Sequence, residues 1–322
     1  PAQRRRGRGR KRVRLAAIVG PTAVGKSRLA IHCALRLGAE ILSCDSMQVY
    51  RGMDIGTAKP SREDRALVPH HLLDLVEPDA DFTVADYQAR ARQLIEEINR
   101  RHRLPMLVGG TGLYYQAVVD DYQLAPMPGD AAVRRALEEE AERDLPGLYA
   151  RLQWEDPVAA ASIRPRDRKR IVRALEVCRV AGRPFSSFQK RNPQRYHLAA
   201  VGLTAPREVL YQRIEQRVDA MLQAGLLEEV AGLWRRGFDL PLNSMQALGY
   251  RQLLSYLHGR CTLEEAVAAI KRETRRYAKR QLTWFRRDGR IRWFDVSEVE
   301  DPAELAGPVC EHIGRTLGVR VE

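Results

Sequence analysis

The sequence predicts an α/β protein, in which a parallel sheet carries a phosphate-binding loop and is interrupted by an all-helical insertion. Three observations lead to this fold class. A short apolar run enters the segment GPTAVGKS (Gly20–Ser27), which is followed by a helical pattern. Further apolar strands alternate with helices up to about residue 120, as in a parallel sheet. Residues 131–180 are charge-rich and helix-periodic, with no convincing strand.

These changes in composition and hydrophobic periodicity divide the chain into three parts. The expected bounds are 1–14 for a basic tail, 15–120 and 197–322 for an α/β core with C-terminal helices, and 121–196 for the helical insertion. Because parallel strands end at one edge of their sheet, the functional loops of the core are expected at that edge.

Short apolar runs predict three strands in the first part of the core: Leu15–Val19, Glu40–Asp45 and Leu104–Val108. Two helices are expected between them: 27–37 and Val84–Asn99. The first helix stops at Gly38, and the second begins with a capping box formed by Thr83 and Asp86. The second strand ends on the carboxylate of Asp45, and the third leads into the glycine-rich segment 109–112.

After the insertion, His197–Thr204 is expected to return to the sheet as a strand. Helices resume from Arg207 and are punctuated by Gly225, Gly237 and Gly249.

The positive charge is concentrated in two segments. The chain carries 54 Lys and Arg against 41 Asp and Glu, a net charge of +13. Residues 4–14 contribute +8 and residues 271–292 another +8, so the rest of the chain is slightly acidic. Such clusters are typical of a polyphosphate partner, although residues 4–14 by themselves fit a solvated tail equally well. In the later segment aromatic side chains interleave with the cations. This pattern suits stacking on unpaired bases together with phosphate contacts, but a basic helix whose aromatic side chains face the core would show the same pattern.

Composition excludes several classes of protein. No apolar run approaches the roughly 18 residues that a membrane span needs, so no membrane partner is expected. The five cysteines form no CxxC pair, which argues against a disulfide framework or a zinc site and favours a reducing compartment. The basic start leads into only a short apolar stretch, so we expect a cytoplasmic protein and no export.

GPTAVGKS matches a phosphate cradle placed between a strand and a helix. Backbone N–H groups and the helix end can hold a di- or triphosphate, Lys26 can neutralise its distal oxygens, and the Ser27 hydroxyl can bind Mg²⁺. Asp45 is placed like the metal-binding carboxylate of a kinase. It opens a longer polar signature, DSMQVY, that such a carboxylate does not need, so the cradle could hold a diphosphate leaving group instead of ATP.

Several motifs stand in order along the chain: GPTAVGKS, DSMQVYRGMDIGTAKP, HHLLDLVEP, GGTGLYYQA, RALEV, RIEQRVDAMLQAGLLEEV, MQALGYRQ and RRYAKRQLTWFRR. From Leu15 to Phe294 the sequence closely resembles the tRNA dimethylallyltransferase family, also called tRNA isopentenyltransferases. The resemblance implies a kinase-like core with a helical insertion that grips the anticodon arm. It implies transfer of a dimethylallyl group from its diphosphate to N6 of adenosine 37, beside the anticodon of tRNA.

The resemblance also implies roles for individual residues. Asp45 corresponds to the general base, and a strand-end carboxylate can accept the proton of an adenine amine; a loop-capping or Mg²⁺-binding role is the alternative. Thr111 corresponds to a residue near the bridging oxygen of the diphosphate. Arg213 and Arg217 share a helix face, and the resemblance favours Arg217. The expected diphosphate site comprises Gly20, Pro21, Thr22, Ala23, Val24, Gly25, Lys26, Ser27, Arg213 and Arg217, with Mg²⁺ on Ser27.

Contacts to tRNA are expected in the segment DSMQ, at both ends of the insertion and in the late basic segment. The expected residues are Asp45, Ser46, Met47, Gln48, Arg134, Lys169, Arg170, Ile171, Val172, Arg173, Arg275, Lys279 and Arg280. The amide of Gln48 suits a base edge, whereas Lys169 replaces the glutamine that is commoner in the family, which puts a base-specific contact there in doubt. Access to N6 requires the base to leave its stack.

Three other functions fit part of the sequence. The cradle alone suits an ATP-dependent small-molecule kinase, and the cradle with Asp45 suits an isopentenyltransferase acting on free adenine nucleotides. A non-enzymatic RNA-binding module would explain the cations but leave GGTGLY and DSMQVY unused. The expected partners are tRNA and dimethylallyl diphosphate, with a monomer favoured.

Overall fold

The computed structural model describes residues 13–123, 129–188 and 191–321 and divides the chain into two compact units. One unit comprises residues up to Val119 and from Arg195 onward, and the other spans Asp120–Gln194. Most of the basic tail lies outside the described residues, and Val13 and Arg14 already belong to the first strand.

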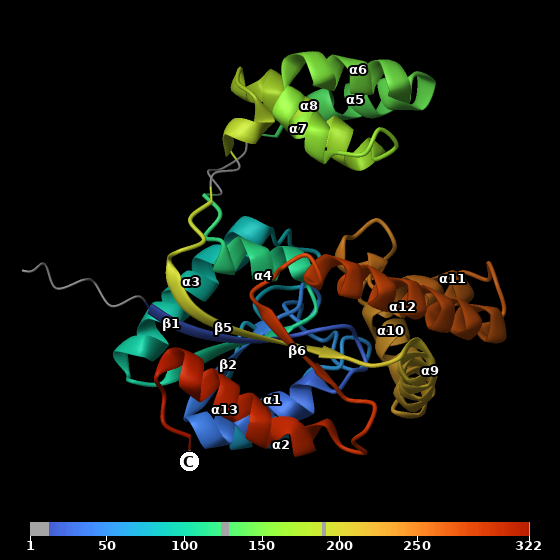
Figure 1. The fold of residues 1–322 in the computed structure, drawn as a ribbon. Coiled ribbons are helices and arrows are strands. Elements are labelled where there is room, and N and C mark those ends of the chain that lie inside the picture. Colours follow the sequence, from blue (N-terminus) through green and yellow to red (C-terminus); the bar gives the residue numbers. More distant parts are fainter. Residues whose placement is uncertain (1–12, 124–128, 189–190, 322) are drawn as a thin grey trace, which may run out of the picture. The chain divides into compact units, whose positions relative to one another are not determined.

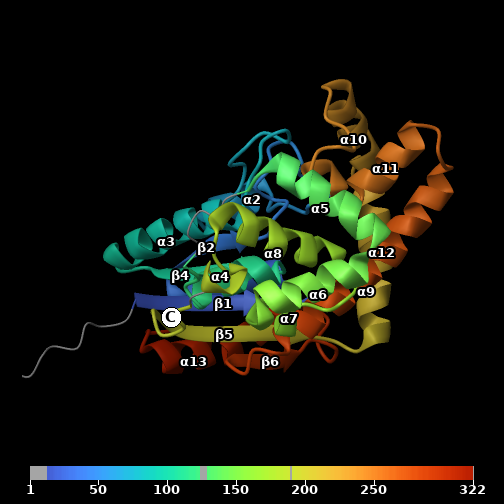
Figure 2. The same ribbon diagram turned by 90° about the horizontal axis from the view of Figure 1, so that it is seen from above.

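Within the described residues of the larger unit, six strands form one parallel sheet in the order β3-β2-β4-β1-β5-β6. They are β1 (Val13–Val19), β2 (Ala39–Cys44), β3 (His70–His71), β4 (Leu104–Gly109), β5 (Tyr196–Thr204) and β6 (Ile291–Asp295). Figure 2 shows β2, β4, β1, β5 and β6 side by side in this order. The α/β prediction is confirmed, although β3 and β6 were not predicted.

The helices of this unit are α1 (Lys26–Leu37), α2 (Arg62–Leu67), α3 (Val84–Arg100), α4 (Gly112–Val119), α9 (Arg207–Gln223), α10 (Leu226–Arg235), α11 (Tyr250–Leu257), α12 (Leu263–Phe285) and α13 (Ala306–Leu317). Two 3₁₀ turns, Ser244–Gln246 and Pro302–Leu305, accompany them. The predicted capping box of α3 is present, since Thr83 and Asp86 bond reciprocally. Gly38 ends α1 in the left-handed conformation, as its position in the sequence predicts.

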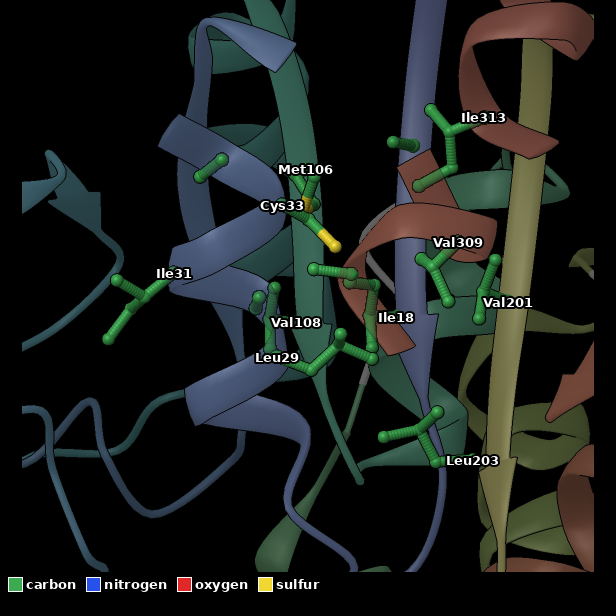
Figure 3. Close-up of a cluster of buried hydrophobic side chains, with 14 of the residues drawn as sticks. Ile18, Leu29, Ile31, Cys33, Met106, Val108, Val201, Leu203, Val309 and Ile313 are labelled. Atoms are coloured by element: carbon green, nitrogen blue, oxygen red, sulfur yellow. The ribbon is translucent and has the colours of Figure 1, made fainter. Parts of the chain in front are cut away.

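The sheet separates two apolar layers. On one face α1 and α13 pack against strands: Leu29 and Cys33 meet Ile18 and Val201 in a cluster that also holds Val309 (Figure 3). On the other face, α3 and α4 pack against the sheet (Figure 1). Strands buried on both sides explain why the sequence shows continuous apolar runs here and not alternation.

The smaller unit is helical. Its elements are α5 (Ala131–Arg143), α6 (Leu145–Glu155), α7 (Pro157–Ser162), α8 (Arg168–Ala181) and a 3₁₀ turn (Phe185–Phe188). It has its own core, centred on Leu137, Leu148, Leu152 and Leu175. Among the described residues of the whole chain, no helix has the length and apolar character needed to cross a membrane.

Candidate active site

The carboxyl end of β1 runs into the phosphate-binding loop that the sequence predicts at Gly20–Ser27. Gly20 has a φ of 146°, and a Cβ there would lie 2.7 Å from the carbonyl oxygen of Leu203 in β5. Only glycine allows this close approach. Helix α1 then begins at Lys26, with Gly25 in the left-handed conformation before it. The loop therefore ends on the positive end of a helix, which is an anion-binding geometry.

A cavity of about 450 Å³ lies at the carboxyl edge of the sheet. The phosphate-binding loop contributes Lys26 and Ser27 to its lining, the end of β2 contributes Asp45, the turn after β4 contributes Gly110, and α9 contributes Arg217. Because β1, β2 and β4 are parallel neighbours, their carboxyl ends converge here. The cradle and the carboxylate that the sequence singles out thus line one cavity.

One part of the cavity wall is apolar. Its side chains come from α9, from the segment between α9 and α11, and from α12: Val218, Met221, Leu226, Ala247 and Ile270. A hydrocarbon chain of a few carbons is suited to this wall, while the phosphate-binding loop supplies the polar part.

Lys26 and Arg217 are two of the cationic side chains that line the cavity. Burial lowers the pKa of the Lys26 ammonium to about 7, the positive charge of Arg217 adds to the decrease, and Asp45 opposes it. Burial also lowers the pKa of Arg217 from its ordinary value, again opposed by Asp45. Lys26 donates to the carbonyl oxygen of Pro21 at 2.5 Å. The site is thus a desolvated cationic pocket, which a polyanion would stabilise.

Asp45 and Thr111 form a corner beside the cavity. Asp45 Oδ1 accepts the backbone N–H groups of Met47 at 2.8 Å and Gln48 at 3.3 Å. Its Oδ2 accepts no hydrogen bond from any residue that the structure describes, so one carboxylate oxygen is available in the cavity. The backbone N–H of Ser46 donates to Thr111 Oγ1 at 3.1 Å, which fixes the threonine beside Asp45.

The side chain of Gln48 lines the cavity and is also engaged within the protein, and its contact with a base edge stays a prediction. Its Nε2 donates to the carbonyl oxygens of Thr57 at 3.0 Å and Ala58 at 3.1 Å. Its Oε1 accepts the hydroxyl of Ser43 at 2.7 Å. With both ends of the amide bonded, Gln48 braces the loop that forms one wall of the cavity.

Glu229 of α10 fixes the backbone of the same wall. Its carboxylate accepts the backbone N–H groups of Asp54, Ile55 and Gly56 at distances of 3.0, 2.8 and 3.3 Å. The hydroxyl of Tyr250 donates to the same carboxylate at 2.5 Å. This partly exposed network shows why the motif after DSMQVY belongs to the site, although none of its residues was assigned to the site from the sequence.

Arg213 does not join Arg217 in the cavity, so its expected diphosphate contact is corrected. Its guanidinium donates to the carbonyl oxygen of Val296 at 3.3 Å, and it is not part of the cavity lining. The two arginines are one helical turn apart on α9. Only Arg217 reaches the site in this structure.

In the smaller unit, Arg134 and Arg173 both bond to Glu176, whose side chain is 0% exposed. Arg134 donates to the two carboxylate oxygens at 3.0 and 3.1 Å, and Asp130 adds its backbone N–H at 3.0 Å. Although burial opposes it, these bonds lower the pKa of Glu176. The two arginines therefore stabilise the insertion itself, which the sequence did not indicate.

Ile171 and Val172 are buried in the insertion core, which corrects their expected contact with tRNA. Lys169 and Arg170, on the preceding turn of α8, are exposed. Lys169 also lines an open hollow of about 710 Å³ with further cations: Arg164, Arg166 and Arg168. The exposed part of this motif is thus basic and the apolar part is structural.

The late basic segment is not one helix, since α12 ends at Phe285 and β6 follows. Phe285 is buried in the core, and Trp284 packs against the same cluster. These aromatic side chains therefore form the core-facing stripe and do not present a stacking surface for bases. Lys279 and Arg280 are exposed, whereas Arg275 forms an ion pair with Glu215 of α9.

The cavity lining also includes residues of α12 that the sequence had not assigned to the site, among them Tyr277 and Gln281. Burial, together with the charge of Asp45, raises the pKa of the Tyr277 hydroxyl, so it stays protonated. Both lie one helical turn apart, in line with Ile270 and Thr274. That spacing was visible as a helical stripe, but nothing in the sequence showed that the stripe faces a cavity.

Magnesium is compatible with the residues present. Among the described residues there is no group of three or more His, Cys, Asp or Glu that could form a closed metal site. The Ser27 hydroxyl is exposed in the cavity next to Lys26. A cation that takes most of its ligands from phosphate oxygens and water, as Mg²⁺ does, needs no more than this.

Comparison with known proteins places the chain among described relatives. Residues 48–288 match the family model described as IPP transferase. The chain is 54% identical to the tRNA dimethylallyltransferase of Moorella thermoacetica, over 96% of this chain and 97% of that protein. It is 51% identical to the one of Syntrophomonas wolfei, over 95% and 99% of the two chains. Its fold is similar to the crystal structure of a tRNA isopentenylpyrophosphate transferase from Bacillus halodurans, with a TM-score of 0.72 and 45% identity over 95% of this chain and 97% of that one.

Proposed function

The chain belongs to the IPP transferase family and is a prenyltransferase that modifies tRNA, and we propose that it alkylates N6 of adenosine 37 beside the anticodon. The prenyl donor is dimethylallyl diphosphate. The observation that carries the proposal is the single cavity lined by the phosphate-binding loop, Asp45, Arg217 and an apolar wall. These are the surroundings that a diphosphate, a proton acceptor and a five-carbon chain each need.

The diphosphate is held by the backbone N–H groups of the phosphate-binding loop, by the end of α1 and by two cations. Lys26 regains its proton when the anion arrives, because a nearby negative charge favours the ammonium. Arg217 is half-buried, and its desolvation strengthens its attraction to the anion. Ser27 would hold Mg²⁺, which when bound neutralises charge on the diphosphate oxygens.

The reaction joins the nitrogen of the adenine amine to C1 of the dimethylallyl group. The bond between C1 and the bridging oxygen breaks, and its electron pair leaves with the diphosphate. The amine loses one proton, which Asp45 Oδ2 accepts. The Thr111 hydroxyl accepts the backbone N–H of Ser46 and donates to Ser46 Oγ at 3.4 Å. This long bond is exchanged for donation to the departing oxygen during the reaction.

The tRNA is held by exposed cations of both units. On α12, Arg280 lines the cavity and Lys279 precedes it in the sequence, and Lys169 and Arg170 lie on α8. Phosphate contacts of this kind position an RNA without reading its sequence. We place the reaction in the cytoplasm, with the enzyme as a monomer; the five cysteines are all free thiols, as suits a reducing compartment.

A transfer assay tests the proposal. The protein is incubated with Mg²⁺, dimethylallyl diphosphate and an anticodon stem-loop carrying A36-A37-A38, and the RNA is followed by mass spectrometry. We expect the mass of one prenyl group on A37, and none when A37 is replaced by guanosine. ATP turnover with a metabolite and no RNA product would establish the kinase alternative. Prenylation of free AMP but not of RNA would establish the isopentenyltransferase that acts on nucleotides. RNA binding without any prenylated product or ATP turnover would establish the non-enzymatic RNA-binding module.

A further inference from the structure

Gln281 connects two loops of the active site through a single side-chain amide. Its Oε1 accepts the backbone N–H of Thr22, in the phosphate-binding loop, at 2.8 Å. Its Nε2 donates to the carbonyl oxygen of Gly110, after β4, at 2.9 Å. The side chain is 6% exposed and also lines the cavity. The two partners fix the orientation of the amide, because one can only donate and the other can only accept.

The fit around this amide is tight. A Cβ on Gly110 would lie 2.1 Å from Gln281 Nε2 and 3.3 Å from the carbonyl oxygen of Gly20. The glycine at position 110 is therefore required for the amide to reach both loops. No other ordinary side chain supplies an acceptor and a donor at this reach, since glutamate only accepts when ionised and leucine or methionine does neither.

The contacts continue from Gly110 to the corner where the proton is accepted. The next residue, Thr111, donates its backbone N–H to the carbonyl oxygen of Cys44 at 3.1 Å. Its hydroxyl oxygen accepts the backbone N–H of Ser46 at 3.1 Å, next to Asp45. A continuous path of hydrogen bonds and peptide bonds thus runs from the diphosphate cradle through Gln281 and Gly110 to Thr111, and through Ser46 to Asp45.

We propose that Gln281 is a positioning residue that sets the spacing between the diphosphate cradle and the Asp45–Thr111 corner. This inference rests on the proposed function and adds a residue to it. A reaction in which one group departs as another attacks depends on that spacing, and a misplacement of about 1 Å can cost roughly 100-fold in rate. Gln281 belongs to α12, which also carries the exposed cations proposed to bind tRNA. The same helix therefore contacts both the phosphate-binding loop and the tRNA.

The test uses single-turnover prenyl transfer to the anticodon stem-loop by the full chain. Gln281→Met keeps the length of the side chain and removes both hydrogen bonds. We expect the transfer rate to fall at least tenfold, with the dissociation constant of the stem-loop unchanged within threefold. The matched control is Gln93→Met, because Gln93 is an exposed glutamine on α3 that bonds only to Glu97; it should react at the wild-type rate.

Two further measurements separate positioning from a loss of structure. Combined with Thr111→Ala, Gln281→Met should lower the rate by less than threefold further, because both act through one corner. Gln281→Glu should recover at low pH: its protonated carboxyl can donate to Gly110 and accept from Thr22. The rate of Gln281→Glu divided by that of wild type should rise as the pH falls. Dividing by the wild-type rate removes the effect of Lys26 and other groups that titrate in both proteins.

A Gln281→Met rate within threefold of wild type would overturn the inference while leaving the proposed function intact. The inference would also be overturned by two results together. The rate losses of Gln281→Met and Thr111→Ala would multiply in the double variant, and the rate of Gln281→Glu relative to wild type would not change with pH. If the wild-type chain transfers no prenyl group at all, it is the proposed function that fails.

Discussion

The protonation of Lys26 makes the binding of the diphosphate depend on pH in a defined direction. Burial lowers the pKa of this ammonium to about 7 in the unliganded chain, Arg217 contributes in the same direction, and Asp45 opposes both. A bound diphosphate reverses the balance, because it places negative charge next to the ammonium. Above pH 7 the protein must therefore take up a proton for each diphosphate that it binds.

The expected magnitude follows from that pKa. A group with a pKa of about 7 is roughly half neutral at pH 7, about 90% neutral at pH 8 and about 99% neutral at pH 9. The dissociation constant should therefore rise roughly fivefold from pH 7 to pH 8 and about ninefold more by pH 9, a total near 2.3 kcal/mol. The ligand itself adds little to this slope, since a terminal phosphate loses its last proton near pH 6.

Calorimetric titration with a non-reacting thiolo analogue of dimethylallyl diphosphate measures this slope. Parallel titrations in buffers of different ionisation enthalpy count the protons, and the count should approach one at pH 8 to 9. Lys26→Arg keeps a charge throughout this range, so its affinity should be nearly independent of pH. A wild-type dissociation constant that stays flat from pH 7 to pH 9 would refute the reasoning, because it would mean that Lys26 is charged before the anion arrives.

Three further outcomes follow from the geometry. Asp45→Asn should slow single-turnover transfer by about 100- to 10,000-fold while diphosphate binding, by the same calorimetry, changes less than threefold; unimpaired transfer would remove Asp45 as the proton acceptor. Arg217→Gln should raise the KM for the diphosphate at least tenfold in steady-state kinetics, whereas Arg213→Gln should change it less than threefold; equal effects would contradict their placement. Glu176→Gln should destabilise the insertion by about 1 to 3 kcal/mol, seen as faster amide hydrogen exchange in 130–181, because Arg134 loses its buried anion; unchanged exchange would contradict this.

The sequence was sufficient for the parts of the site that depend on local signals. A buried strand followed by GPTAVGKS dictates the loop and the start of α1, and a parallel sheet then brings the ends of β1, β2 and β4 together. That rule alone places Asp45 near the cradle, and the structure shows them in one cavity.

The remaining details depend on tertiary packing. Two residues of β3 are too few for a pattern, and β6 (IRWFD), at an edge of the sheet, shows neither a continuous apolar run nor a clean alternation. The motif residues Ile171 and Val172 follow exposed cations but turn into a helical core, because residues adjacent in a helix point about 100° apart.

The amides illustrate a second limit of the sequence. Gln48 and Gln281 carry the same side chain, and each is bonded at both ends. The partners of Gln48 lie within 10 residues of it, whereas Gln281 joins loops that are 259 and 171 residues away in the chain. No local pattern encodes such a pairing.

A crystal structure of the protein with the thiolo analogue and the anticodon stem-loop addresses the central claim most directly. We expect A37 turned out of its stack, its N6 within about 3 Å of Asp45 Oδ2, and the diphosphate on the loop 20–27. An adenine bound outside the cavity, or a diphosphate held away from the loop with Asp45 remote from N6, would contradict the account.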